Sequence, residues 1–160
     1  MAGEAVRGSG RQGVTSTEVG LRYLSLGYHL RKVVDDGMTA GGLSLARTKV
    51  LQVLDRLGAV RQSVLARELG QAARSVTQSV EALEREGLIE RTADPGDARS
   101  KLVRLTPEGT QALAAGTAAG ERVLEEVFGA MGRDRLADLD RLLDVIQGGL
   151  AGGAGGAGNR

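Results

Sequence analysis

The sequence predicts a mainly α-helical protein of the α+β class. Apolar residues recur at spacings of three and four along most of residues 15–147, which is the period of an amphipathic helix. The pattern changes around residues 88–105, where two short strands are indicated. Glycines follow several of the helical segments, as the left-handed turn at a helix end requires. The core has to be aliphatic, because 41% of the residues are hydrophobic but only 2% are aromatic.

The first helix is expected to run from about Thr15 to about Asp36, with a hydroxyl among residues 15–17 as its cap and Gly37 at its end. Its apolar residues form two stripes, which are Val19, Tyr23, Leu26, Leu30 and Val33 on one side and Leu21, Leu24 and Tyr28 on the other. A helix on the surface of a single globule needs only one stripe. Two stripes indicate burial from two sides, as in a subunit interface.

Three shorter helices are expected at about 45–57, 62–69 and 73–86, with Ser44 capping the first of them. Their inward faces are set by helically spaced apolar residues, which are Val50, Val53, Leu54, Leu57, Leu65, Ala66, Leu69, Val76, Val80 and Leu83. The turn between the second and third of these helices is short and contains Gly70. Two helices joined in this way are typical of a helix-turn-helix.

A β-hairpin is expected next, with strands at 88–92 and 101–105 joined through the turn-forming residues 94–97. Thr106 and Pro107 then begin a helix, because a capping hydroxyl is followed by proline at the first helical position. This order of three helices, a hairpin and a long helix is that of a winged helix-turn-helix.

The two C-terminal helices are expected at about 107–130 and 133–147. Gly116 and Gly120 weaken the first of these predictions, since glycine destabilises a helix interior. The last helix carries an apolar seam at alternating spacings of three and four, made of Leu136, Leu139, Leu143, Ile146 and Leu150. Such a seam is suited to packing against another helix, for example one from a second subunit.

The segments Ser63–Gly70 and Ser75–Arg91 resemble the helix-turn-helix of the MarR family. The stretch from Asp97 to Gly109 is similar to the family's wing, with a D-x-R signature and an L-T-x-x-G exit. Many members have Arg at the position that Ala98 occupies here. The resemblance covers about residues 15–147. It implies a homodimeric transcriptional regulator, commonly a repressor, that binds a near-palindromic operator in double-stranded DNA.

Five segments are expected in the chain. They are a disordered leader at 1–13, an N-terminal dimerisation helix and linker at 14–40, a winged helix-turn-helix DNA-binding lobe at 41–106, C-terminal dimerisation helices at 107–147, and a Gly-rich disordered tail at 148–160. The leader and the tail are predicted from their glycine-rich, aperiodic composition.

The predicted DNA contacts lie on the helix of residues 73–86 and on the wing. Because Val76, Val80 and Leu83 must face the core, the polar residues opposite them are exposed, and the N-terminal half of such a helix lies nearest the bases. Gln can bond adenine and Arg can bond guanine with two hydrogen bonds each. The predicted DNA-binding residues are Gln62, Ser63, Arg74, Ser75, Thr77, Gln78, Asp97, Arg99 and Lys101.

Different roles are expected within this set. Gln62 and Ser63 open their helix and can bond phosphates, or simply cap it. Arg99 is predicted to enter the minor groove, braced by Asp97. Nearby acidic residues offset much of the local positive charge, so affinity should be moderate and strongly salt-dependent. These acidic residues are Glu81, Glu84, Glu86, Glu90 and Asp94.

The resemblance also implies a pocket for a small aromatic or phenolic effector between the dimerisation domain and the DNA-binding lobe. Its predicted lining is Arg22, Leu26, His29, Met38, Leu45 and Arg47. No cofactor and no metal site are expected, because the chain has no cysteine and one histidine. The sequence shows no membrane span and no export signal, so a cytoplasmic location is expected.

Two other functions remain as alternatives. The formal net charge is only +1, which agrees with a winged-helix protein-interaction module that has no specific DNA site. An enzyme is not expected, because the sequence contains no P-loop, dinucleotide fingerprint, catalytic triad or cluster of metal ligands.

Overall fold

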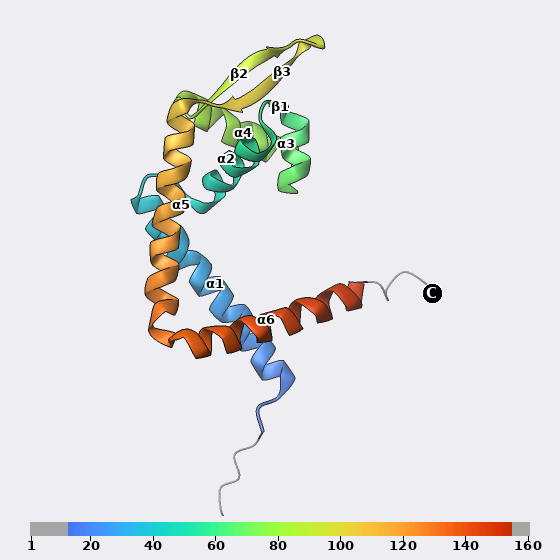
Figure 1. The fold of residues 1–160 in the computed structure, drawn as a ribbon. Coiled ribbons are helices and arrows are strands. Elements are labelled where there is room, and N and C mark those ends of the chain that lie inside the picture. Colours follow the sequence, from blue (N-terminus) through green and yellow to red (C-terminus); the bar gives the residue numbers. More distant parts are fainter. Residues whose placement is uncertain (1–12, 155–160) are drawn as a thin grey trace, which may run out of the picture. The chain divides into compact units, whose positions relative to one another are not determined.

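The computed structural model describes residues 13–154, except for the side chains of residues 98, 99, 153 and 154 (Figure 1). The chain divides into two compact units, residues 1–33 and residues 34–160. Its elements are helices and one small antiparallel sheet, which confirms the predicted fold class. The predicted leader lies outside the described residues apart from Gly13, which is exposed and in no regular element.

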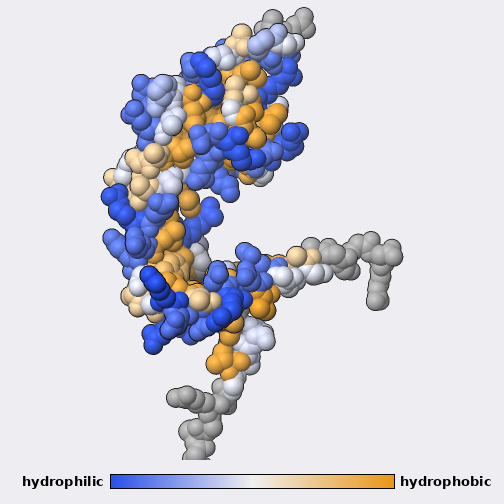
Figure 2. All heavy atoms as spheres, in the orientation of Figure 1, coloured by the Kyte–Doolittle hydropathy of each residue, from blue (hydrophilic) through white to orange (hydrophobic). Residues whose placement is uncertain are grey.

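Helix α1 (Ser16–Ala40) begins with a capping box, as the predicted hydroxyl cap requires. The Thr15 amide donates to Glu18 Oε2 over 2.9 Å, and the Glu18 amide donates to Thr15 Oγ1 over 3.3 Å. The Thr15 amide, and then the Thr15 hydroxyl, which donates to the same Glu18 oxygen over 2.8 Å, lower the pKa of the Glu18 carboxyl. The apolar residues of both predicted stripes are mostly exposed in residues 16–33, with Leu24 at 68%. Figure 2 shows hydrophobic residues at the surface of this helix.

Gly37 does not end α1, which contradicts the prediction. The helix continues to Ala40, and Gly42 then takes the positive φ of +98° that ends a helix. A Cβ atom at position 37 would lie 2.5 Å from Val123 Cγ2, on helix α5 (Pro107–Phe128). Gly37 therefore permits a close approach of the last turns of α1 to α5, which is a tertiary role that helical spacing does not reveal.

Helices α2 (Leu45–Leu57), α3 (Gln62–Leu69) and α4 (Ala73–Arg85) agree with the predicted bounds to within one residue. Ser44 caps α2, as predicted, by accepting from the Arg47 amide. The core beneath these helices is aliphatic throughout. Its buried members are Leu43, Val50, Leu51, Val53, Leu54, Leu65, Ala66, Val76, Val80, Leu83, Ile89, Val103 and Leu113.

The sheet has three strands in the order β1-β3-β2, one more than the sequence predicts. Strand β1 (Val60–Arg61) pairs with β3 (Asp97–Leu105) through Val60 opposite Val103. Strand β2 (Ile89–Asp94) pairs with the other edge of β3. Strands β2 and β3 and the turn between them form the wing, which extends beyond the cluster of α2, α3 and α4 in Figure 1. Both strands are longer than predicted.

Thr106 joins the end of the wing to the end of α4. Its hydroxyl donates to the Gly87 carbonyl over 2.6 Å and accepts from the Gly109 amide over 3.0 Å. Its amide donates to the Leu88 carbonyl over 3.2 Å. The predicted cap therefore holds two elements together as well as beginning α5.

The two glycines that weaken the prediction of α5 are sites of close packing. A Cβ atom at Gly116 would lie 3.1 Å from Leu43 Cδ2, and one at Gly120 would lie 3.1 Å from Met38 Sδ. The absence of side chains here lets α5 approach the end of α1 and the start of α2. This packing offsets the intrinsic cost of glycine in a helix.

Helix α6 (Arg133–Ala154) follows a short 3₁₀ turn, Gly129–Met131, and is longer than predicted. It continues through residues 148–154, which were expected to be a loose tail, and residues 155–160 lie outside the described part of the chain. Extending an existing helix is easier than starting one, and Leu150, Ala151 and Ala154 favour helix despite the glycines between them.

Candidate nucleic-acid interface

Helix α4 is held to the core by three aliphatic residues on one face. Val76, Val80 and Leu83 are each 0% exposed, which confirms the predicted inward face. Arg74, Ser75 and Gln78 lie in the N-terminal half and are exposed. The helix therefore presents a guanidinium, a hydroxyl and a carboxamide to solvent at its N-terminal end. These are groups that hydrogen-bond base edges and phosphates.

The helices of the helix-turn-helix begin without side-chain caps. The N-cap residues are Arg61 for α3 and Ala72 for α4, and neither makes a capping hydrogen bond. In contrast, Ser44 and Thr106 cap α2 and α5. The first-turn amides of α3 and α4 are thus left for another acceptor. Ser63, in the first turn of α3, is exposed.

Gln62 and Thr77, two of the predicted DNA-binding residues, are bonded to each other. Gln62 Nε2 donates to Thr77 Oγ1, and this hydroxyl donates in turn to the Ala73 carbonyl over 2.9 Å. Both side chains are partly buried. The pair connects the first residue of α3 to the N-terminal half of α4.

The tip of the wing is held by acidic residues. Asp94 Oδ1 accepts from the Gly96 amide over 2.9 Å, and Arg61 Nε donates to Asp94 Oδ2 over 2.7 Å. The Gly96 amide and then Arg61 lower the pKa of the Asp94 carboxyl. Arg61 therefore holds the tip of the wing, and sequence reasoning missed this role because Arg61 lies on the unpredicted strand β1.

Asp97, predicted to brace Arg99, accepts from Ser100 Oγ over 2.7 Å and lies 3.8 Å from an Arg61 nitrogen. The Arg99 side chain lies outside the described residues, so its predicted bond to Asp97 stays a prediction. Lys101 is exposed on β3.

Most acidic residues near α4 have basic partners other than Arg74 and Lys101. Glu84 lies 3.3 Å from Arg91, and Glu90 lies 2.7 Å from Arg104. The Glu86 carboxylate is paired with Arg47, and the Asp94 carboxylate with Arg61. Among the side chains that the structure describes, Arg74 and Lys101 have no ion-pair partner. The carboxylates are thus paired with other arginines, and the basic groups at the N-terminal half of α4 and on the wing are not neutralised by them.

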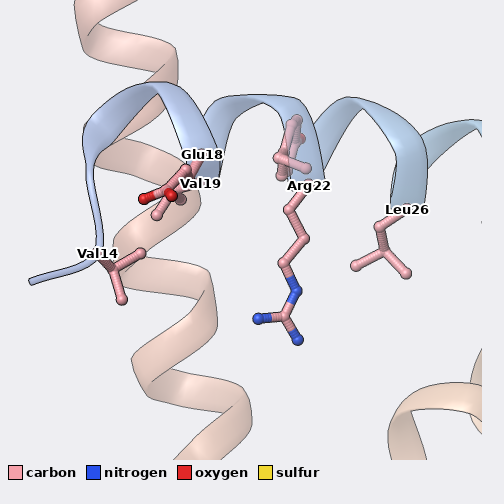
Figure 3. Close-up of a pocket in the computed structure, with 6 residues that line it drawn as sticks. Val14, Glu18, Val19, Arg22 and Leu26 are labelled. Carbon is pink, nitrogen blue, oxygen red and sulfur yellow. The ribbon is translucent and has the colours of Figure 1, made fainter. Parts of the chain in front are cut away.

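The six residues of the predicted effector pocket are divided between the two units. Arg22 and Leu26 line an open groove along α1, together with Val14, Glu18, Val19 and Tyr23, and Figure 3 shows Val14, Arg22 and Leu26 pointing the same way. His29 is exposed, and its ring lies 5.7 Å from that of Tyr28 in an edge-on arrangement.

In the second unit, Met38 is only 3% exposed and packs against Gly120. The Leu45 amide donates to Asp35 Oδ1 over 2.7 Å, and Arg47 is paired with Glu86. These three residues therefore have structural contacts of their own. Among residues 13–154, no three or more His, Asp or Glu side chains gather where they could hold a metal, and no helix is both long and apolar enough to cross a bilayer.

The buried spine of α4, the uncapped start of α3 and the adjoining wing define a winged helix-turn-helix protein. Residues 43–101 match the model of the MarR family. This match agrees with the family resemblance that the sequence motifs indicate.

Two curated relatives are transcriptional regulators by name. The chain is 30% identical over 87 residues to the uncharacterized HTH-type transcriptional regulator YdgJ of Bacillus subtilis, covering 54% of this chain and 53% of that protein. It is 35% identical over 101 residues to a putative transcriptional regulatory protein for the hcr operon of Thauera aromatica, covering 56% and 58%. The matches thus span little more than half of each relative's length. These names agree with the prediction that the chain is not an enzyme.

A solved structure of a MarR variant from E. coli, complexed with operator DNA, has the same fold. Its TM-score is 0.64 at 21% identity, and the match covers 80% of this chain and 92% of that one. The agreement extends beyond the segment that the family model matches.

Proposed function

We propose that the chain is a sequence-specific DNA-binding transcriptional regulator that inserts α4 into the major groove. The observation that carries this proposal is the burial of Val76, Val80 and Leu83 opposite an exposed N-terminal half of the same helix. A helix that is fixed on one face and polar on the other can enter the groove without unfolding. The operator complex of the E. coli MarR variant supports DNA binding by a chain of this fold.

Within this proposal, Ser75 and Gln78 contact base edges, and Arg74 contacts either a base or a phosphate. Ser63 contacts a phosphate at the open start of α3. The wing places Lys101 and Arg99 near the backbone and the minor groove, with Asp97 holding the turn. Because the neighbouring carboxylates are occupied by other arginines, Arg74 and Lys101 are available to phosphates. Affinity then depends strongly on salt, since each neutralised phosphate releases counterions.

The active form that we propose is a homodimer on a near-palindromic operator. Apolar side chains are exposed along α1 and α6, including Leu24 at 68% and Val145 at 72%. Monomeric proteins rarely expose so many apolar side chains in contiguous patches. A dimer built on these helices presents two α4 helices about one turn of DNA apart, roughly 34–36 Å.

The regulator is proposed to repress transcription in the cytoplasm and to respond to a small aromatic or phenolic effector. The groove along α1 supplies Arg22 as an anion partner and Leu26 and Tyr23 as apolar contacts. Conformations of the dimer can differ in the spacing of the two α4 helices. An effector that binds one of these conformations more tightly shifts the protein toward it and so changes its affinity for DNA.

Replacing Gln78 by Ala tests the proposed base contact. Against a duplex selected from a random pool by the wild-type protein, we expect affinity to fall by about 5- to 150-fold, which corresponds to the roughly 1–3 kcal/mol of one bidentate base contact. Affinity for a scrambled duplex should not change, because phosphate contacts remain. Fluorescence anisotropy measures both values.

Gln111→Ala is the matched control, since Gln111 is an exposed glutamine on a different helix, α5. It should bind both duplexes as the wild type does. Equal discrimination by Gln78→Ala and the wild type would remove Gln78 from the interface.

A protein-interaction module without a specific DNA site is the second candidate, and the net charge of only +1 favours it. A salt titration of duplex binding separates the two functions. A DNA-binding regulator loses affinity linearly on a log–log scale, with a slope of about −0.9 for each phosphate contact. An interaction module shows no preferred duplex at any salt concentration.

A further inference from the structure

We infer that Gln62 and Thr77 position α4 for base reading and do not themselves read bases; this inference rests on the proposed DNA-binding function. The two side chains come from different helices, and their bond joins the start of α3 to the N-terminal half of α4. Gln78, the proposed base contact, is the next residue after Thr77. A shift of Thr77 therefore displaces the group that meets the base.

The hydroxyl of Thr77 has no hydrogen left to donate to DNA. Its single hydrogen is donated to the Ala73 carbonyl over 2.9 Å, and one of its lone pairs accepts from Gln62 Nε2. A hydroxyl has one donor and two acceptor sites. A contact from Thr77 to a phosphate or to a base acceptor would have to break the bond within α4.

Among the described residues, no other side-chain hydrogen bond joins the start of α4 to another helix. Its N-cap residue, Ala72, supplies no capping side chain, so the first turn lacks the usual stabilisation of a helix start. Val76, Val80 and Leu83 hold the helix through apolar contacts, which are non-directional. The hydrogen bond from Gln62 adds an orientation between the two helices that burial alone does not set.

Two substitutions at Thr77 separate positioning from base contact. Thr77→Ser keeps the hydroxyl and removes the methyl group, whereas Thr77→Val keeps a methyl group and removes the hydroxyl. If Thr77 acts through the pair with Gln62, Ser should behave as the wild type and Val should lose function. If instead its methyl group contacts a thymine, Ser should lose affinity and Val should keep it.

Hydrogen exchange of the free protein tests the pair without DNA. In Thr77→Val and in Gln62→Met, we expect the amides of the first turns of α4 to exchange about 2- to 10-fold faster, the range of one neutral hydrogen bond. The double variant should exchange no faster than Thr77→Val, because that substitution already removes the bond to Gln62. Ser79→Ala is the matched control. The Ser79 hydroxyl also donates to a carbonyl four residues earlier, that of Ser75 over 3.1 Å, and among the described residues it has no bond to α3.

A second experiment measures the binding of each variant to the selected and the scrambled duplex. Thr77→Val and Gln62→Met should each lower the preference for the selected duplex about 2- to 10-fold without further loss in the double variant, while Thr77→Ser and Ser79→Ala keep it. Additive losses, or a loss in Thr77→Ser as large as in Thr77→Val, would overturn the inference. If the wild type prefers no duplex, the proposed function fails, and the exchange data still decide whether the pair orders α4.

Discussion

Substituting Gly109 by Ala is expected to lower the free energy of unfolding by about 2 to 4 kcal/mol, the range of the larger overpacking effects. A Cβ atom at this position would lie 1.9 Å from the Leu88 carbonyl oxygen and 2.9 Å from its carbon. Both are backbone atoms, so they cannot rotate away as a side chain can. The clash also falls where Thr106 joins the wing to α4, because the Gly109 amide donates to Thr106 Oγ1.

The change has an opposing effect, since alanine is better than glycine in a helix by about 1 kcal/mol. Gly148→Ala isolates that effect, because a Cβ atom there meets nothing within 4 Å. Urea unfolding at one fixed protein concentration should show the Gly109 variant less stable and the Gly148 variant as stable as the wild type or more so. Equal stability of the Gly109 variant and the wild type would mean that α5 and the end of α4 are not packed as described.

Removing residues 133–160 is expected to abolish the proposed homodimer and to weaken binding to a two-site duplex by about 100- to 10,000-fold, as loss of bivalency does. The deleted segment holds α6, whose exposed apolar residues have no cover within the described chain. These residues are Leu142, Val145, Ile146 and Leu150. The lobe should stay folded, since its core cluster lies entirely between Leu43 and Leu113.

Sedimentation velocity checks the assembly, and circular dichroism checks the fold. The truncated chain should sediment as a monomer, or aggregate through the remaining exposed residues of α1. Removal of residues 155–160 alone is the control and should leave a dimer. A soluble dimer after the larger deletion would count against this arrangement of the interface.

Local patterns were sufficient to predict most of the helices. Ser44 and Thr106 have side chains that cap a helix, and each begins one at the predicted residue. Gly70 adopts the left-handed conformation that its place in the turn requires. These signals act over a few residues, so they can be read from a single sequence.

Features that depend on distant residues were not predicted. Strand β1 has two residues, too few for a period, and exists because Val60 pairs with Val103. Gly37 has the appearance of a helix end, and only the approach of Val123 explains why the helix passes through it. In both cases tertiary packing decided the local structure.

In the candidate site, too, local patterns predicted some features, whereas contacts between distant residues decided others. The apolar period of α4 predicted which face is buried and hence that Arg74 and Gln78 are exposed. The pairing of Gln62 with Thr77, 15 residues away, and of Arg61 with Asp94, 33 residues away, could not be read from spacing. Hydrogen bonds between polar residues leave no periodic signal, so the residues that hold the site were harder to recognise than those that face outward.

The central claim is that α4 lies in the major groove, and DNA cleavage by a probe tethered to α4 tests it most directly. The chain has no cysteine, so one introduced cysteine carries an iron chelate at a single position. Glu81→Cys places it on the exposed side of α4, and Gln111→Cys places it on α5 as a control. With the probe on α4, we predict cleavage of the selected duplex at two clusters about 10 base pairs apart, each centred on a major groove. Cleavage no stronger from α4 than from α5, or spread evenly along the duplex, would contradict the account.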